Sequence, residues 1–189
     1  MPNDLLKEYA HLFTRQAPPG PILDLASGSC GNGIFLAQKG LKVICCDISS
    51  EALQPVKEIA NDQGLDVDLW QLDLERESVN PLPEDFFAGI LVFRYLHRPL
   101  VPCIKKAIKP GGILIYETFT IEQPKFGKPH NPNYLLKPGE LFSWFGDWNV
   151  LFHFEGITRN PSRAVAQIVC QKRKNTAAPP RLSAGFGRG

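Results

Sequence analysis

Short apolar runs alternate with amphipathic stretches along most of this chain. Five segments are predicted to be strands, at residues 21–26, 42–47, 67–72, 88–93 and 113–118, of which 67–72 alternates apolar and polar residues. The run at 88–93 is apolar throughout, which is typical of a central parallel strand covered on both faces. Helical spacing of apolar residues fills the intervals, for example between Ser49 and Gly64. The alternation predicts an α/β fold with a doubly wound parallel sheet.

The first residues and the region after 118 depart from this alternation. Apolar residues at helical spacing behind Asn3 predict a helix over 4–15. Residues 119–137 are rich in proline, glycine and basic side chains and lack apolar periodicity, which is typical of a functional loop. We expect this loop and the first helix to form a lid over a substrate.

The C-terminal part is expected to complete one domain. A short helix near 138–145 precedes two apolar stretches, at 149–155 and 164–171, that are predicted to be strands. Residues 173–189 contain prolines and scattered glycines without a core-forming pattern, so we expect a disordered tail there. Residues 1–172 then form a single domain, which suits a chain of 189 residues.

Composition narrows the class of protein. A net charge of +2 and an apolar content of 43% describe an ordinary globular protein without the basic excess of a dedicated nucleic-acid binder. Cys45, Cys46 and Cys170 lie in predicted strands, where we expect them to fill space rather than form bridges. The cysteine spacing fits no zinc site, so no metal is expected. No apolar run reaches membrane-spanning length and the N-terminal stretch is amphipathic with an acid at Asp4, so we expect no membrane partner and a cytoplasmic location.

The most specific chemical signal is a strand, a glycine-rich turn, a helix and a second strand that ends in an acid. The turn contains Gly28, Gly31 and Gly33, and the acid is Asp47. Glycines let the backbone approach a ligand, the helix presents free N–H groups to it, and the acid can bind ribose hydroxyls. This order predicts a nucleotide pocket.

Two cofactors compete for that pocket. The stretch from Gly28 to Gly33 would match the dinucleotide fingerprint if Cys30 were glycine, and a side chain at that position would crowd the pyrophosphate of NAD. Asp24, four residues before the first glycine, would face the pyrophosphate with like charge. S-adenosylmethionine instead carries an ammonium and a sulfonium, which the same acid attracts. The residues therefore favour S-adenosylmethionine.

Several motifs together resemble a known family. Leu-Asp24-Leu-Ala-Ser-Gly28, Asp47, Gln71-Leu-Asp73-Leu and Lys109-Pro-Gly-Gly112 are similar to the ordered motifs of class I S-adenosylmethionine-dependent methyltransferases, over about residues 20–172. Three stretches most resemble the small single-domain branch related to tellurite-resistance and thiopurine-type methyltransferases. They are Gly-Asn-Gly33, Leu96-His-Arg-Pro and Tyr116-Glu-Thr-Phe. The resemblance implies a Rossmann-like, seven-stranded, mostly parallel sheet with an antiparallel edge hairpin, and S-adenosylmethionine as cofactor.

One residue departs from the family pattern. Cys30 stands where members of the family usually have glycine. We expect the turn to open slightly or to use Gly31 instead, and we expect weaker cofactor affinity as a result.

Residues at the ends of the predicted strands are the candidates for binding the cofactor. They are Asp24, Ala26, Ser27, Gly28, Asn32, Gly33, Asp47, Ile48, Asp73, Leu74, Phe93 and Arg94. Asp47 is expected to bind the ribose, although an acid before a helix can also serve only the helix dipole. For Asp73 and Leu74, recognition of the adenine edge is implied mainly by the resemblance, because a strand-ending aspartate is common in turns.

Catalytic residues are harder to assign, because methyl transfer is an in-line displacement that depends mainly on proximity and alignment. Tyr95, His97 and Glu117 are candidates at strand ends, and His130 would join them if its loop folded over the site. His97 could instead orient its turn, and Glu117 could anchor the loop.

Two arginines and one asparagine-containing motif are further candidates for contact with a ligand. Arg94 and Arg98 could hold an anionic substrate or the cofactor carboxylate. Asn131-Pro-Asn-Tyr134 resembles the Asn-Pro-Pro-Tyr signature of amino methyltransferases, but it does not follow the fourth strand, so turn chemistry is favoured.

Three functions are compatible with these residues. We favour a methyltransferase that acts on a small molecule or soft nucleophile. The second possibility is an RNA or protein acceptor that binds a rim of basic and aromatic residues, namely Lys105, Lys106, Lys109, Lys125, Lys128, Lys137, Phe126 and Tyr134. The third is a cofactor-binding subunit without catalysis.

Overall fold

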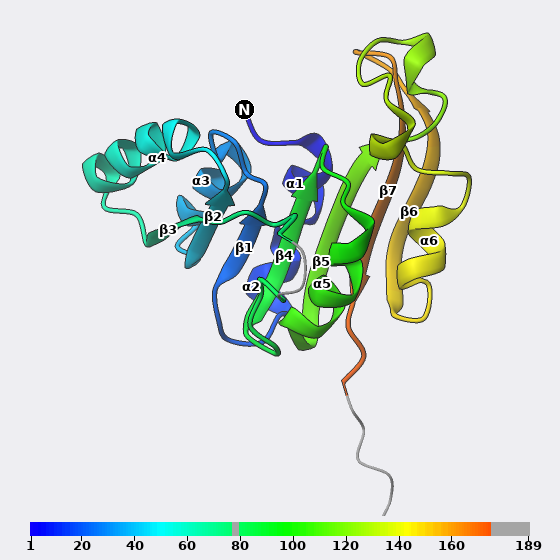
Figure 1. Ribbon diagram of the computed structural model, residues 1–189. Helices are drawn as coiled ribbons and strands as arrows, with labels where there is room; N and C mark the ends of the chain where they lie inside the picture. Colours follow the sequence, from blue (N-terminus) through cyan, green and yellow to red (C-terminus); the bar gives the residue numbers. More distant parts are fainter. Residues whose placement is uncertain (77–79, 175–189) are drawn as a thin grey trace, which may run out of the picture.

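The computed structural model describes residues 1–76 and 80–174, and it is organised around a seven-stranded sheet in the order β3-β2-β1-β4-β5-β7-β6 (Figure 1). The strands are β1 (Ile22–Leu25), β2 (Val43–Asp47), β3 (Val67–Gln71), β4 (Phe87–Phe93), β5 (Ile108–Phe119), β6 (Asn149–Thr158) and β7 (Arg163–Gln171). The first five pair in parallel, and β7 pairs antiparallel with both β5 and β6. The expected mostly parallel sheet with an antiparallel edge hairpin is therefore confirmed.

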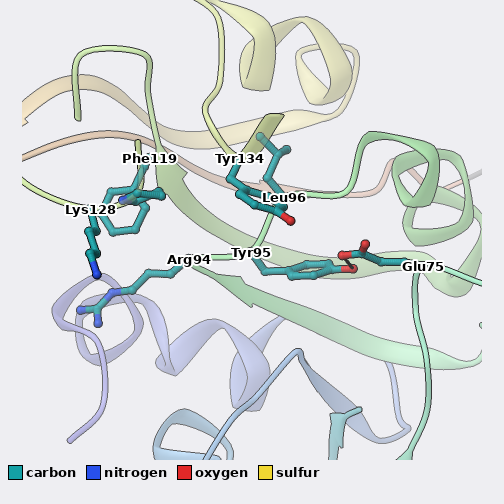
Figure 2. Close-up of a pocket in the computed structure, with 8 residues that line it drawn as sticks. Glu75, Arg94, Tyr95, Leu96, Phe119, Lys128 and Tyr134 are labelled. Carbon is teal, nitrogen blue, oxygen red and sulfur yellow. Dashed lines mark hydrogen bonds between the residues drawn. The ribbon is translucent and has the colours of Figure 1, made fainter. Parts of the chain in front are cut away.

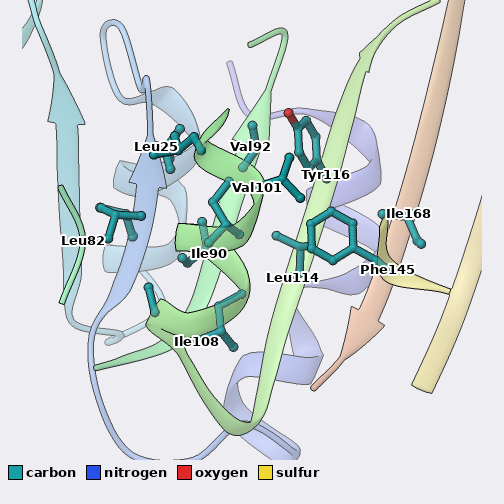
Figure 3. Packing of buried hydrophobic residues seen from close by; sticks show 14 of the residues in the cluster. Leu25, Leu82, Ile90, Val92, Val101, Ile108, Leu114, Tyr116, Phe145 and Ile168 are labelled. Carbon is teal, nitrogen blue, oxygen red and sulfur yellow. The ribbon is translucent and has the colours of Figure 1, made fainter. Parts of the chain in front are cut away.

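Helices cover both faces of the sheet. They are α1 (Asp4–Tyr9), α2 (His11–Arg15), α3 (Gly31–Ala37), α4 (Ser50–Gln63), α5 (Val101–Ala107) and α6 (Glu140–Phe145), with short 3-10 helices η1 (Arg98–Leu100), η2 (Gln123–Lys125) and η3 (Pro132–Tyr134). One core cluster packs helices α1, α2, α3 and α4 against one face of the sheet. Leu91 of β4 belongs to this cluster. The other joins α5 and α6 to the opposite face through Ile90, Val92 and Phe145 (Figure 3). Successive residues of β4 thus enter different cores, as a strand buried on both faces requires.

Capping residues fix the helix ends that the sequence predicts. The Asn3 side chain accepts a hydrogen bond from the Leu5 N–H and begins α1, although the helix expected over 4–15 is divided at Ala10. The Ser49 side chain accepts from the Ala52 N–H at the start of α4, and Gly64 ends that helix in the left-handed conformation.

The sequence analysis expected the fifth strand to begin after Lys109-Pro-Gly-Gly112. The structure corrects this boundary, because the segment lies within β5. Phe87 pairs with Ile108 and Gly89 with Ile113, so the additional residues of β5 form an irregularity in the ladder. Gly111 has φ 83°, which glycine tolerates and other residues disfavour. The turn residues were recognised correctly, but the strand continues on both sides of them.

The loop expected over 119–137 is ordered by local contacts. It contains η2 and η3, and a parallel bridge joins Thr120 to Leu136. The expected disordered tail falls almost entirely on residues 175–189, which lie outside the described residues. Within residues 1–76 and 80–174, no helix has the length and apolarity needed to cross a membrane.

Candidate functional site

The glycine-rich turn after β1 is held against the end of β2. Ala26, Gly28 and Cys30 have φ values of 52°, 53° and 51°, so alternate residues of the turn are left-handed. The Gly28 N–H donates to Asp47 Oδ2 at 2.7 Å, and the Ser27 N–H donates to the Cys46 carbonyl at 2.9 Å. The structure therefore brings together the glycine turn and the acid that the sequence proposed as parts of one site.

Asp24 lies beneath the turn. Its side chain is only 1% exposed, and its Oδ2 accepts a hydrogen bond from the Gly33 N–H at 2.8 Å. Burial raises the pKa of Asp24 to about 7, although the Gly33 N–H opposes the shift and the charge of Asp47 adds to it. Asp24 thus holds the start of α3 directly, and its side chain is too deeply buried to line the ligand side of the turn.

Cys30 and Cys45 form a disulfide below the same turn, with their Cα atoms 6.0 Å apart. The expectation that Cys45 only fills space is therefore wrong, whereas Cys46 and Cys170 are buried free thiols as expected. The pairing was missed because Cys30 and Cys45 become neighbours only when the turn folds onto β2. The Cys30 side chain is directed into the core, so the ligand side of the turn is not crowded by it.

The edge of the turn next to β2 carries the proposed ribose and adenine residues. Asp47 Oδ1 accepts from the Ser49 N–H at 3.0 Å, and because a carboxylate has about four acceptor positions, it retains capacity for ribose hydroxyls. Ile48 is 63% exposed, which places an apolar surface beside Asp47. Asp73 Oδ1 accepts from the Glu75 N–H in a turn, and Leu74 is buried in the core. Only the backbone of Leu74 is therefore available to an adenine ring.

The ends of β4 and β5 are tied to the N-terminal helix. Arg94 has φ 58°, and its N–H donates to the Glu117 carbonyl at 2.8 Å. The Glu117 carboxylate is buried and accepts from the side-chain amides of Asn3 and Gln167. The Asn3 N–H in turn donates to Asn32 Oδ1 at 2.8 Å. Glu117 and Asn32 therefore anchor α1 across the site, and a catalytic role for Glu117 stays a prediction.

A cavity of about 420 Å³ opens at the ends of β4 and β5 (Figure 2). Its lining residues are Glu75, Arg94, Tyr95, Leu96, Phe119, Lys128, Pro129 and Tyr134. Of the catalytic candidates, only Tyr95 belongs to this lining. His97 is the N-cap residue of η1, and Glu117 lies within β5. Phe93, another expected cofactor residue, is half-buried and packs on the core that includes α1 and α2.

Tyr95 is a hydrogen-bonding residue rather than a base at neutral pH. Its hydroxyl donates to Glu75 Oε1 at 3.3 Å, and burial, followed by the nearby Glu75 charge, raises the pKa of Tyr95. The phenol therefore keeps its proton. Sequence reasoning did not find Glu75, Phe119 or Pro129, because they reach the cavity from segments that the local pattern leaves unconnected.

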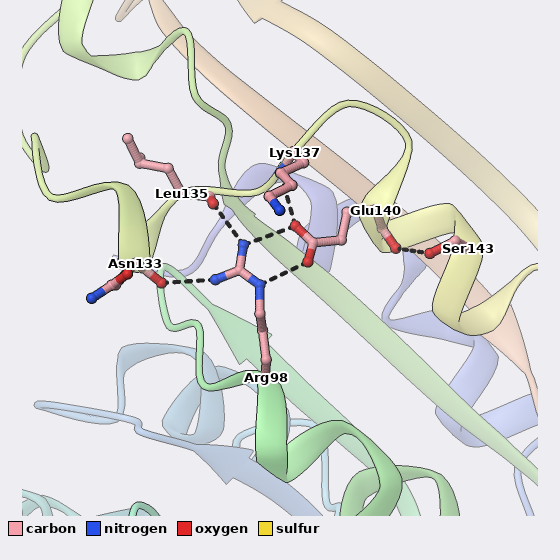
Figure 4. A network of polar contacts seen from close by, with 6 residues as sticks. All are labelled: Arg98, Asn133, Leu135, Lys137, Glu140 and Ser143. Atoms are coloured by element: carbon pink, nitrogen blue, oxygen red, sulfur yellow. Dashed lines mark hydrogen bonds and ion pairs between the residues drawn. The ribbon is translucent and has the colours of Figure 1, made fainter.

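Arg98 stabilises the loop over 119–137 through hydrogen bonds and an ion pair (Figure 4). Its guanidinium donates to both oxygens of Glu140, at 2.7 and 2.8 Å, and to the carbonyls of Asn133 and Leu135, at 3.0 and 2.9 Å. Contact with Arg98 lowers the pKa of Glu140. This network fixes η3, so that Tyr134 is positioned over the cavity. Asn131 caps the same short helix by accepting from the Asn133 N–H, which is the turn chemistry that the sequence favoured.

Most of the proposed basic rim is already paired. Lys105 contacts Asp147, Lys106 contacts Glu84, and Lys125 contacts Glu122. Lys109 donates to the Pro19 carbonyl. Because these cations have partners within the chain, the rim offers few unpaired charges for a nucleic-acid backbone.

Comparison with known proteins agrees with this architecture. A family model described as a methyltransferase domain matches residues 22–112. Hemagglutinin 1 of Eikenella corrodens is 27% identical over 146 residues, and the match covers 74% of this chain and 47% of the relative. The probable S-adenosyl-L-methionine-dependent methyltransferase TehB of Haemophilus influenzae is 24% identical over 144 residues, and the match covers 74% of this chain and 49% of the relative. This chain thus spans about half the length of these curated relatives.

The crystal structure of Haemophilus influenzae TehB has the same fold, with a TM-score of 0.70 at 18% identity over 90% of this chain and 62% of that chain. Together with the sheet order and the turn after β1, these matches show that the chain is similar to the class I S-adenosylmethionine-dependent methyltransferases. TehB is similar to this chain in both sequence and fold, in agreement with the branch that the motifs resemble.

The family implies S-adenosylmethionine as the cofactor, and the residues of the turn fit it. Ser27 Oγ is the one buried side-chain polar atom without a hydrogen-bond partner in residues 1–76 and 80–174, and it lies in the turn itself. Ala26 and Arg94, at the ends of β1 and β4, both hold the left-handed backbone that is uncommon outside glycine. These two strands flank the point where the strand order reverses, which is where open α/β sheets bind ligands.

Proposed function

We propose that this chain binds S-adenosylmethionine over the turn after β1 and transfers its methyl group to a small molecule held in the cavity at the ends of β4 and β5. The observation that carries the proposal is the position of the two sites on either side of the strand reversal between β1 and β4. Asp47 would hold the ribose, and Gly28 and Ser27 would contact the cofactor from the turn. The bound cofactor supplies an electrophilic methyl group on a sulfonium.

The residues of the cavity would position the acceptor, and the loop over 119–137, together with α1, would exclude water. A volume of about 420 Å³ lies in the range of small-molecule sites, which supports a small acceptor over a macromolecule. The paired lysines of the rim support the same choice. The one carboxylate of the lining, Glu75, accepts a hydrogen bond from the Tyr95 hydroxyl, so we expect the acceptor to arrive with a free electron pair or to lose its proton to water.

Calorimetric titration with S-adenosylhomocysteine tests cofactor binding. Saturable binding is expected, and Asp47→Ala should weaken it by roughly 1–3 kcal/mol, because the ribose hydroxyls lose their acceptor. Asp68→Ala, at an exposed acid of the neighbouring strand, is the matched control. Unchanged affinity in the Asp47 variant would refute the ribose assignment. Methyl transfer to a broad acceptor panel separates an enzyme from a cofactor-binding subunit.

A further inference from the structure

Two cations share the acceptor cavity without a partner for their charge. Arg94 follows β4, and Lys128 comes from the loop between β5 and α6. In Figure 2 both side chains extend toward the same end of the cavity. Neither takes part in any of the ion pairs formed within residues 1–76 and 80–174, although Arg98, Lys105, Lys106, Lys125 and Lys172 do. Like charges that converge in this way repel one another unless an anion lies between them.

The backbones of these two exposed residues are held in place by hydrogen bonds. Gln123 is 3% exposed; its side-chain amide donates to the Lys128 carbonyl at 3.0 Å, and its side-chain oxygen accepts from the Ala164 N–H at 2.9 Å. The backbone of Lys128 is thereby fixed to β7. The backbone of Arg94 is fixed to β5 by its hydrogen bond to the Glu117 carbonyl. Anchoring the two backbones reduces the main-chain ordering that binding would otherwise require.

Apart from Glu75, the rest of the cavity lining is apolar or neutral. Phe119, Leu96, Pro129 and Tyr134 provide aromatic and aliphatic surface between the two ends. Glu75 lies at the end away from the cations and accepts a hydrogen bond from the Tyr95 hydroxyl (Figure 2). A small inorganic anion would occupy only a minor part of about 420 Å³ and would leave the apolar surface uncovered.

We propose that the methyl acceptor is an organic anion with a flat apolar body. Its negative group binds between Arg94 and Lys128, and its body packs between Phe119 and Tyr134. This inference rests on the proposed function, because it specifies the class of substrate for the same site. A guanidinium favours carboxylates and related anions through paired hydrogen bonds, whereas the lysine adds a point charge.

The test compares two probes of the same shape, 2-naphthoate and its neutral amide, 2-naphthamide. Fluorescence titrations are carried out on the full chain with saturating S-adenosylhomocysteine. The acid should bind about tenfold or more tightly than the amide, as expected for a charge-assisted contact. Its affinity should also fall as salt is raised, whereas that of the amide should not.

Three variants locate the effect. Arg94→Gln and Lys128→Gln should each reduce binding of the acid about tenfold and leave binding of the amide nearly unchanged. Lys125→Gln is the matched control, because Lys125 lies on the same loop, carries the same charge, is paired with Glu122 and does not line the cavity. It should bind both probes as the parent does. Using both cavity variants keeps the test decisive if one of them folds poorly.

The inference is overturned if the acid and the amide bind equally, if neither binds, or if both cavity variants retain the affinity of the parent for the acid. It is also overturned for Arg94 if Arg94→Gln loses S-adenosylhomocysteine binding while it retains binding of the acid, since Arg94 would then serve the cofactor. Titration with S-adenosylhomocysteine alone keeps the two proposals separate. If that ligand does not bind the parent chain, the proposed function fails, whatever the naphthoate result.

Discussion

Replacing Asp24 by asparagine should remove a large pH dependence of stability. In the unfolded chain this carboxyl ionises near its ordinary pKa of 3.8, whereas burial in the fold raises the pKa to about 7. Between these values the folded state binds more protons than the unfolded state, so the free energy of unfolding falls as the pH rises. The contribution of Asp24 is fully present below the unfolded pKa and is lost as the pH rises through about 7.

The size of the effect follows from the shift. A difference of roughly 3 pKa units corresponds to about 4 kcal/mol, at about 1.4 kcal/mol per unit. No reduction for solvent screening applies, because the side chain is only 1% exposed. Asparagine has nearly the same shape, and its side-chain oxygen can still accept from the Gly33 N–H, so the variant changes mainly the charge.

The assay is urea unfolding of the parent and of Asp24→Asn from pH 4 to pH 8.5 at constant ionic strength. The difference in unfolding free energy should move in favour of the variant by up to about 4 kcal/mol across this range, with most of the change between pH 4 and 7. Asp73→Asn removes an exposed carboxylate from the same edge of the sheet and serves as the control. Parallel stability curves for the parent and Asp24→Asn would refute the assignment of a buried, proton-binding Asp24.

Two further predictions concern the loop and the cysteines. Arg98→Met should lower the free energy of unfolding by about 2–4 kcal/mol, because Glu140 and two carbonyls lose their donor. Arg98 lowers the pKa of Glu140, so the pair stabilises the fold above the unfolded pKa of that carboxyl and ceases to do so as the pH falls. If the loss of unfolding free energy in Arg98→Met is undiminished at pH 3, this reasoning is contradicted. Chain purified without reductant should expose three of its five cysteines to alkylation after denaturation, namely Cys46, Cys103 and Cys170, and all five after reduction; mass spectrometry that finds five before reduction would exclude the disulfide.

The parallel sheet was predictable from the chain because most of its strands are apolar runs, and 67–72 alternates apolar and polar residues as a half-buried strand does. The pattern at 88–93 indicates a strand buried on both faces, and β4 is such a strand. The boundary of β5 was less accessible, because Lys109-Pro-Gly-Gly112 has the composition of a turn and becomes part of the strand only through its irregular pairing with β4.

The candidate site was predictable to the extent that it depends on short-range motifs. The turn at Gly28 and the acid at Asp47 could be connected from their order in the chain, and the structure joins them by a hydrogen bond. The acceptor cavity could not be derived in this way, because Arg94 and Lys128 are brought together by the anchoring of a proline-rich loop through Gln123 and Arg98. Those anchors have no periodic signal in the sequence.

The roles of individual charged residues were the least predictable feature. Arg98 and Glu117 were candidates for contact with ligands, yet both are engaged by partners from distant segments. An isolated sequence does not show whether a charge at the end of a strand faces a ligand or a neighbouring element, since the distinction is made by tertiary packing.

The most direct test of the account is a pair of calorimetric titrations of the purified chain, one with S-adenosylhomocysteine and one with NAD. The account predicts saturable binding of S-adenosylhomocysteine with one site per chain, weakened in Asp47→Ala, and no measurable binding of NAD. Binding of NAD in the absence of any binding of S-adenosylhomocysteine would contradict it.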